Sequence, residues 1–218
     1  MIGIVVAMEK EANCLFPLIK NLKEQNLAGK KLFLGKLFNK EIAMIISGIG
    51  KVSSALSTQA LIDKYDLEYI FNFGSAGAVN KNLTICNYYL IEKCMQFDFD
   101  LREIDDVPLG YIQDYNKVFF ETTPLDTNLF DKITLATADK FTSKKETIDE
   151  IIKIGIDIRD MEGCAIAQVC TSNNVKLIML KGVSDVYGSG NDGQQFIQNL
   201  GRLSQGFPEA INKIFQLL

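Results

Sequence analysis

The sequence predicts an α/β protein with a single domain over residues 1–218 and a mixed, mostly parallel central sheet flanked by helices. Three observations predict this class. Short apolar runs of strand length alternate with segments of helical periodicity. No stretch rich in Pro, Gly or Ser and no run of charge divides the 218 residues. Hydrophobic residues make up 47% of the chain, which is enough for a substantial core.

The first third of the chain contains three strand-like runs and two segments of helical spacing. Residues 2–8 are continuously apolar, as a strand buried on both faces would be. Residues 9–22 place apolar side chains three and four positions apart, which is the periodicity of a helix. The predicted elements in chain order are a strand at 2–8, a helix at 9–22, strands at 31–37 and 41–47 joined at Asn39-Lys40, and a helix at 51–65 opened by Gly48-Ile49-Gly50.

The rest of the chain alternates in the same way, apart from one irregular stretch. A buried strand at 68–73 ends at Gly74-Ser75-Ala76-Gly77, whereas residues 97–128 are polar and aromatic without a regular period. The other predicted elements are strands at 85–92 and 132–138, a helix at 144–155, a strand end at 158–161, a helix at 162–172, a strand at 176–183 and a terminal helix at 192–217.

Composition excludes several classes of function. A net charge of −4 and a pI near 5.0 leave no concentrated basic face for nucleic acid. Because the chain has no histidine, acid–base chemistry must rest on carboxylates, Lys, Tyr or Cys, and a mixed Cys/His zinc site is excluded. The five cysteines form no Cys-x-x-Cys pair, and the apolar run at 1–6 is too short for a membrane span or a signal peptide. We therefore expect a cytoplasmic protein with neither nucleic acid nor membrane as a partner.

Polar and small residues follow the predicted strands. In a sheet of this class the ligand lies at the carboxyl ends of the strands, where the connecting loops converge. The residues at the predicted strand ends are Met8 with Glu9 and Glu11, 48–50, 74–77, Asp139 with Phe141, Met161 with Glu162, and Ser184 with Asp185. We expect them to share one rim of the sheet.

Each of these residues also has an ordinary structural explanation. A carboxyl desolvated at the end of a buried strand suits a proton donor near neutral pH, but Asp185 could equally cap the next segment. Glu162, at the start of a helix, could bind ribose hydroxyls or serve as a cap. Glu11 could face solvent in the first turn of a helix, and Phe141 could stack on a flat ring or belong to the core. Taken singly, the residues leave these alternatives open.

Six motifs occur together in the order of one family. They are Gly3-Ile-Val-Val-Ala-Met-Glu-Lys-Glu11, Ser47-Gly-Ile-Gly-Lys-Val52, Asn72-Phe-Gly-Ser-Ala-Gly77, Thr137-Ala-Asp-Lys-Phe141, Asp160-Met-Glu-Gly-Cys-Ala-Ile-Ala167 and Gly182-Val-Ser-Asp185. Over essentially its whole length, the chain resembles the 5′-methylthioadenosine/S-adenosylhomocysteine nucleosidases, which belong to the purine nucleoside phosphorylase and uridine phosphorylase superfamily. The resemblance implies a homodimer that hydrolyses the N-glycosidic bond of these adenine nucleosides with no metal or organic cofactor.

The resemblance also implies a role for each site residue. Asp185 protonates the purine at N7 and Ser184 orients it, Glu11 positions or deprotonates the attacking water, and Glu162 binds the ribose hydroxyls. Cleavage of this bond develops positive charge on the ribose and negative charge on the base, so anions at the sugar and an acid at the base suit it. The other implied substrate-binding residues are Met161 against the sugar, Ser75 and Gly77 along the sugar and base, Phe141 and Thr142 at the purine, Phe196 closing over the base, and Ala7 and Ile49.

Two other functions remain as alternatives, a phosphate-dependent purine nucleoside phosphorylase and a catalytically silent nucleoside-binding or storage protein. Phosphorylases of the superfamily hold phosphate with amino-terminal arginines, and this chain has no arginine before Arg102, which favours water as the nucleophile. The chain departs from the family at Thr142, where an apolar residue is expected, and at Lys181, where arginine is frequent. The stretch 97–110 lacks the family's aromatic-rich pattern, which leaves the preferred 5′ group open.

Overall fold

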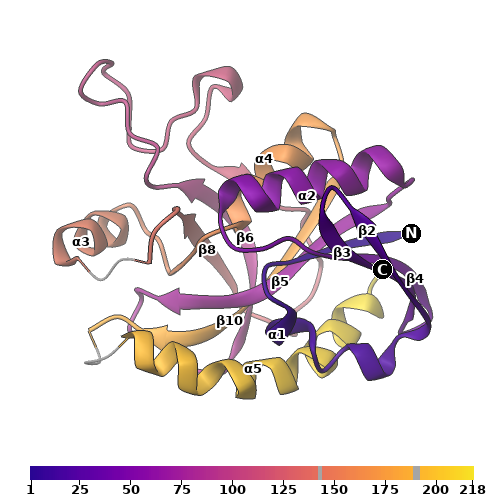
Figure 1. The fold of residues 1–218 in the computed structure, drawn as a ribbon. Helices are drawn as coiled ribbons and strands as arrows, with labels where there is room; N and C mark the ends of the chain where they lie inside the picture. The colour runs from indigo at the N-terminus through magenta and orange to yellow at the C-terminus, as the bar shows by residue number, and fades with distance from the viewer. Residues whose placement is uncertain (142–143, 189–191) are drawn as a thin grey trace.

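The computed structural model describes residues 1–141, 144–188 and 192–218. Figure 1 traces its strands and helices in chain order from indigo to yellow. The elements are β1 (Ile2–Val6), α1 (Glu9–Ala12), the 3₁₀ helix η1 (Phe16–Leu18), β2 (Lys20–Leu27), β3 (Lys30–Leu37), β4 (Lys40–Ile46), α2 (Lys51–Lys64), β5 (Tyr69–Ala78), β6 (Tyr88–Gln96), η2 (Gln113–Tyr115), β7 (Phe120–Glu121), β8 (Lys132–Thr137), α3 (Lys145–Lys153), β9 (Ile158–Asp160), α4 (Gly163–Ser172), β10 (Lys176–Val186) and α5 (Asp192–Phe215).

The described strands form one sheet, ordered β10-β6-β8-β9-β5-β1-β4-β3-β2 with β7 beside β6. β10 also pairs with β5, so that β5, β10, β6, β8 and β9 close into a barrel. Among the described strands, five pairings are parallel and five are antiparallel. The sheet is therefore mixed, as predicted, but it is not mostly parallel. The antiparallel pairs are β2–β3, β3–β4, β6–β10, β6–β7 and β5–β9.

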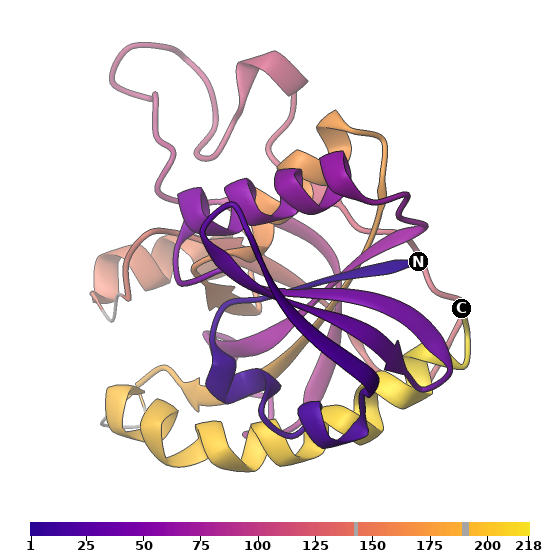
Figure 2. The ribbon, with the colours of Figure 1, turned by 45° about the vertical axis from the view of Figure 1, so that its right-hand side comes forward.

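Helices cover both faces of the sheet, as predicted. Figure 1 and Figure 2 show α2 and α4 together on one face and α5 running along the opposite face near α1. α5 buries apolar side chains at intervals of three and four residues, the pattern of a helix with one face on a core. Its buried apolar residues are Leu200, Leu203, Phe207, Ala210, Ile211, Ile214 and Phe215. No helix within the described ranges is long and apolar enough to cross a membrane.

The helix predicted at 9–22 is wrong beyond its first turn. α1 ends at Ala12, and η1 and β2 occupy the rest of the range. Pro17 lies in η1, where its missing N–H and its ring prevent a continuous helix. Asn21 has a φ of 55°, in the left-handed region that a helix does not use. β2 is an edge strand and almost wholly exposed, so its polar sequence carries little strand signal.

Two tight turns join β2, β3 and β4. Ala28 and Gly29 have φ values of 50° and 73°, and Phe38 and Asn39 have values of 48° and 66°. Two successive positive φ values are what a two-residue type I′ hairpin requires. The hairpin predicted at Asn39-Lys40 is therefore confirmed, with its turn one residue earlier.

β5 and β10 continue past their predicted ends, as far as Ala78 and Val186. The pairing between these two strands shifts by one residue between Val183 and Asp185, which makes Ser184 the extra residue of a β-bulge. A bulge bends its strand and redirects the neighbouring side chains. The bulge thus helps to aim Asp185 at the space over the end of the sheet.

Candidate active site

A cavity of about 200 Å³ opens where the carboxyl ends of β1, β5 and β10 meet. Eleven of the twelve predicted site residues line it. They are Ala7, Glu11, Ile49, Ser75, Gly77, Phe141, Met161, Glu162, Ser184, Asp185 and Phe196. The twelfth, Thr142, lies outside the described residues. The fold thus brings residues from the beginning, middle and end of the chain around one space.

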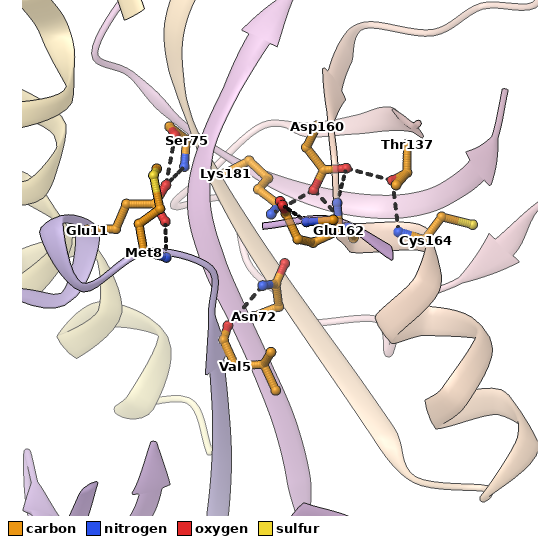
Figure 3. A network of polar contacts seen from close by, with 12 residues as sticks. Val5, Met8, Glu11, Asn72, Ser75, Thr137, Asp160, Glu162, Cys164 and Lys181 are labelled. Carbon is orange, nitrogen blue, oxygen red and sulfur yellow. Dashed lines mark hydrogen bonds and ion pairs between the residues drawn. The ribbon is translucent and has the colours of Figure 1, made fainter. Parts of the chain in front are cut away.

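Glu11 is buried, with only 2% of its surface exposed, so it does not face solvent in a helical turn. Its Oε1 accepts hydrogen bonds from the Ser75 N–H and the Ser75 hydroxyl, each at 2.7 Å, and its Oε2 accepts one from the Met8 N–H at 3.2 Å (Figure 3). A Cβ at Gly74 would stand 3.1 Å from Oε1, so glycine leaves room for the carboxylate. Burial raises the pKa of Glu11, and the Ser75 bonds and the charge of Lys181 oppose that rise.

Glu162 is the residue that precedes α4, but its side chain makes no capping bond to that helix. Its Oε1 instead accepts a hydrogen bond of 2.9 Å from the Gly50 N–H, at the start of α2. Burial, followed by the negative charge of Asp160, raises the pKa of Glu162 to about 7, although Lys181 and the Gly50 N–H act against this. A carboxyl with such a pKa gains and loses its proton close to neutral pH.

A buried ion pair lies beside Glu162. Lys181 Nζ is 2.9 Å from Asp160 Oδ2, and both side chains are almost fully buried. Asp160 also accepts a hydrogen bond of 2.6 Å from the Thr137 hydroxyl, as Figure 3 shows, and one of 2.9 Å from the Gly163 N–H. Burial lowers the pKa of Lys181, but the attraction of Asp160 and Glu162 outweighs burial and the pKa is raised. Lys181 therefore remains charged among these carboxylates.

Asp185 is buried, with 1% of its surface exposed, and lies inside β10 rather than capping a segment. Its Oδ1 accepts a hydrogen bond of 2.6 Å from the Ser184 hydroxyl, whose oxygen also lies 3.2 Å from the Ala76 carbonyl oxygen. Its Oδ2 lies 3.6 Å from Arg159 Nη2. Burial raises the pKa of Asp185, while the Ser184 bond and Arg159 lower it.

The three carboxyl groups form two separate electrostatic environments. Glu11 and Glu162 act on one another and share the field of Lys181, whereas the cation that acts on Asp185 is Arg159. One part of the cavity therefore holds two neighbouring carboxyl groups and another holds a single one, and burial raises the pKa of all three. This arrangement suits the cleavage of a bond whose two sides develop opposite charge. Within the described ranges, no group of three or more His, Cys, Asp or Glu side chains could hold a metal ion.

Aromatic and apolar side chains form the open side of the cavity. Phe141 is 54% exposed, which excludes the core explanation for it, and its ring centroid lies 6.4 Å from that of Phe196 at an angle of 63°. Ile49 is also exposed, and Ala7 and Met161 are half-buried. An exposed ring at Phe141 and a half-buried ring at Phe196, beside polar groups, are suited to hold a planar ligand.

Sequence reasoning assigned no site role to three charged residues. Arg159 and Asp160 line the cavity, and Lys181 pairs with Asp160. The available signal was their position, because Arg159 and Asp160 lie in β9 and Lys181 follows the apolar run 177–180 of β10. Charged side chains are almost never fully buried unless they are paired, so such positions indicate an ion pair or a site.

Comparison with known proteins identifies a family for this site. Residues 1–213 match the phosphorylase superfamily. A 5′-methylthioadenosine/S-adenosylhomocysteine nucleosidase of Oceanobacillus iheyensis is 31% identical over 215 residues, which cover 92% of this chain and 93% of the relative. The chain belongs to this nucleosidase family. The family predicted from the six motifs is thus confirmed.

Solved structures of nucleosidases share the fold over the whole chain. A mutant of the Helicobacter pylori nucleosidase, with 5′-methylthioadenosine in its active site, has a TM-score of 0.90 and 26% identity and covers 100% of this chain and 98% of that one. The native futalosine hydrolase of Helicobacter pylori strain 26695 has a TM-score of 0.89 and 26% identity, over 100% and 97% of the two chains. The nucleoside phosphorylase-like α/β fold is therefore confirmed.

Proposed function

We propose that this nucleosidase hydrolyses the N-glycosidic bond of 5′-methylthioadenosine and S-adenosylhomocysteine, releasing adenine and the substituted ribose. The observation that carries the proposal is the division of one cavity between two coupled carboxylates, Glu11 and Glu162, and a separate buried acid, Asp185. The relative from Oceanobacillus iheyensis, which is named for these two nucleosides, supports the choice of substrates.

The geometry supports a role for each carboxyl group. Asp185, whose pKa is raised by burial, donates a proton to purine N7 as the bond between C1′ and N9 breaks. The ribose then gains positive charge, which Glu11 and Glu162 stabilise in their ionised forms, the form of Glu162 above about pH 7. Glu162 accepts hydrogen bonds from the ribose hydroxyls beside Met161, and Glu11 takes the proton of the water that attacks C1′. Ser184 holds the Asp185 carboxyl by its hydrogen bond of 2.6 Å.

Water, rather than phosphate, is the proposed nucleophile. The N–H and the hydroxyl of Ser75 both donate to Glu11, so these donors are already engaged by an anion that would repel phosphate. Lys181 is paired with Asp160. Arg159, the one of the three arginines that lines the described cavity, lies beside Asp185 at the base end. No arginine is therefore placed to hold phosphate next to Glu11.

Product analysis tests the function. Purified protein is incubated with 5′-methylthioadenosine, S-adenosylhomocysteine and deoxyadenosine in ¹⁸O-labelled water, with and without phosphate. We expect adenine from the first two substrates at a rate independent of phosphate, and ¹⁸O in the released sugar. A requirement for phosphate, with a sugar phosphate as product, would identify a phosphorylase. Binding of the nucleosides without release of adenine would identify a silent binding protein.

We further propose that two copies of the chain form a homodimer. Ile49, Val52 and Leu56 are exposed apolar residues, three and four positions apart, and Val52 is 80% exposed. Such a stripe is suited to a partner surface, and Ile49 also lines the cavity, so the stripe borders the site. In Figure 1 and Figure 2 the chain between β6 and β7 stands away from the body above α2, where it could reach a second copy. Light scattering should give a dimer for the wild type and a monomer for Val52→Glu, and a monomeric wild type would contradict the proposal.

We also propose that residues 1–218 form a single domain located in the cytoplasm. One continuous sheet includes strands from β1 to β10, which supports a single domain. All five cysteines, each among the described residues, are free, as expected in a reducing compartment. Limited proteolysis should leave one resistant core, and cell fractionation should recover the activity with cytoplasmic markers.

A further inference from the structure

Arg159 is a charged residue of the cavity that the proposed reaction does not use. It lies on β9 opposite Gly77 of β5 and is only 6% exposed. Its Nη2 lies 3.6 Å from Asp185 Oδ2 and 3.4 Å from Asp192 Oδ2, and its guanidinium carbon lies 5.2 Å from the centre of the Phe141 ring. The guanidinium therefore stands at the base end of the cavity, between the acid and the aromatic ring.

One nitrogen of this guanidinium and one oxygen of the acid are left open. Within the described part of the chain, Arg159 Nε and Asp185 Oδ2 are fully buried and make no hydrogen bond. A Cβ at Gly77 would stand 2.7 Å from Oδ2 and 3.3 Å from Nε, so the glycine leaves both atoms facing the same small space. Buried polar atoms in folded proteins nearly always have partners. An open donor beside an open acid indicates a ligand edge with two adjacent polar atoms.

The edge of a purine that carries N7 provides such a pair. On a 6-oxopurine, N7 and O6 are both acceptors, whereas on adenine N7 accepts and the 6-amino group donates. A guanidinium group only donates, so Arg159 can bind O6 but meets a 6-amino group donor to donor. We propose that the enzyme also hydrolyses 6-oxopurine nucleosides, with Arg159 binding O6 while Asp185 protonates N7. This inference rests on the hydrolase function proposed above and adds a second class of base to it.

The hydrolysis of a 6-oxopurine nucleoside balances in the same way as that of an adenine nucleoside. The bond between C1′ and N9 breaks with both electrons going to the base, and Asp185 gives its proton to N7. The water oxygen bonds to C1′, and Glu11 takes the proton that the water loses. The products are a neutral 6-oxopurine and the free sugar, and the proton on Glu11 returns to Asp185 through solvent. Negative charge on the departing base spreads to O6, where the Arg159 cation stabilises it.

Asp192 explains how one pocket can accept both kinds of base. This residue begins α5, and its carboxylate is a second partner for the Arg159 guanidinium at 3.4 Å. With a 6-oxopurine bound, the guanidinium can donate to O6 and to Asp192 together, because it has five N–H donors. With adenine bound, it can keep its bond to Asp192 and leave the 6-amino group unopposed.

A pair of substrates that differ at position 6 of the purine tests the inference. We expect the wild type to release hypoxanthine from 5′-methylthioinosine as well as adenine from 5′-methylthioadenosine. In Arg159→Gln, the ratio of kcat/KM for the 6-oxo substrate to that for the 6-amino substrate should fall roughly 10- to 100-fold, the discrimination typical of an arginine–base contact. Arg159→Lys keeps the charge but loses the Nε–H donor, so its ratio should fall by less. Arg202→Gln removes an exposed arginine of α5 and should leave the ratio unchanged.

Three outcomes of the turnover assays would overturn the inference while the hydrolase function stands. They are a wild type that cleaves 5′-methylthioadenosine but releases no hypoxanthine, an Arg159→Gln variant that slows both substrates equally, and an Arg159→Lys variant with the wild-type ratio. Arg159→Gln could fail to fold because two aspartates lose their counter-ion. In that case the Arg159→Lys variant and inhibition by free hypoxanthine test the inference. Hypoxanthine should inhibit the cleavage of 5′-methylthioadenosine by the wild type, and no inhibition refutes the inference. Release of neither base would overturn the hydrolase function itself.

Discussion

Glu162→Gln removes a charge that the fold disfavours. Burial and the charge of Asp160 raise the pKa of Glu162 from 4.5 to about 7. At about 1.4 kcal/mol for each pH unit, this shift disfavours the ionised side chain by about 3 kcal/mol. Glutamine has the shape of the neutral carboxyl, and its amide oxygen can still accept the hydrogen bond of 2.9 Å from the Gly50 N–H. We therefore expect the variant to be about 3 kcal/mol more stable than the wild type at pH 8.

The difference should depend on pH in one direction. Below pH 4.5 the Glu162 carboxyl is protonated in both the folded and the unfolded protein, so glutamine makes little difference. Between pH 4.5 and about 7 the folded protein keeps this proton and the unfolded protein loses it, so the free energy of unfolding falls as pH rises. Above about pH 7 both states are ionised and the full loss remains. Glu162→Gln should lack this decline.

Urea denaturation followed by circular dichroism at pH 5, 6, 7 and 8 measures the effect. Glu68→Gln is the matched control, because Glu68 is exposed, and it should follow the wild type at every pH. Adenine release by Glu162→Gln should fall steeply, since the ribose hydroxyls lose their anionic partner. Equal stability of Glu162→Gln and the wild type at pH 8, or parallel pH profiles, would refute the reasoning about burial.

Three further substitutions test single contacts of the site. Ser75→Ala removes the hydroxyl bond of 2.7 Å that lowers the pKa of Glu11, so the acidic limb of the pH profile of kcat/KM should move to higher pH. An unmoved limb would contradict the role of Glu11 as the base. Gly77→Ala would place a Cβ 2.7 Å from Asp185 Oδ2 and should lower turnover about 100-fold in a folded protein, whereas normal turnover would show that Asp185 can move without consequence. Lys181→Met breaks the buried ion pair of 2.9 Å and should lower the free energy of unfolding, measured by urea denaturation, by about 3–5 kcal/mol. A loss under about 1 kcal/mol would contradict the importance of that pair for stability.

Sequence reasoning located the rim of the site because strand periodicity determines where strands end. Asp185 follows an apolar run and Glu162 follows the short strand β9, and the carboxyl ends of neighbouring strands converge in space. The environment of Glu11 was less accessible, because its local sequence is typical of a solvated helical turn. Its burial depends on Ser75, which lies 64 residues further along the chain. A contact of this range leaves no trace in local periodicity.

The barrel and the amino-terminal hairpin lie beyond what local patterns can predict. Closure depends on β10 pairing with β5 and β6 at once, which is decided by long-range packing. β2 is exposed on the edge of the sheet, so its sequence does not need the apolar alternation of a half-buried strand. Arg159 was overlooked because its partners, Asp185 and Asp192, follow it by 26 and 33 residues.

Asp185→Asn tests most directly whether the buried carboxyl at the base end drives the cleavage. Asparagine keeps the size of the side chain and can accept the Ser184 bond, but it has no acidic proton to donate. We predict that kcat for adenine release from 5′-methylthioadenosine falls by roughly 10²- to 10⁴-fold, the usual contribution of a general acid, while adenine still binds and the circular dichroism spectrum is unchanged. Turnover near the wild-type value in the folded variant would contradict the account.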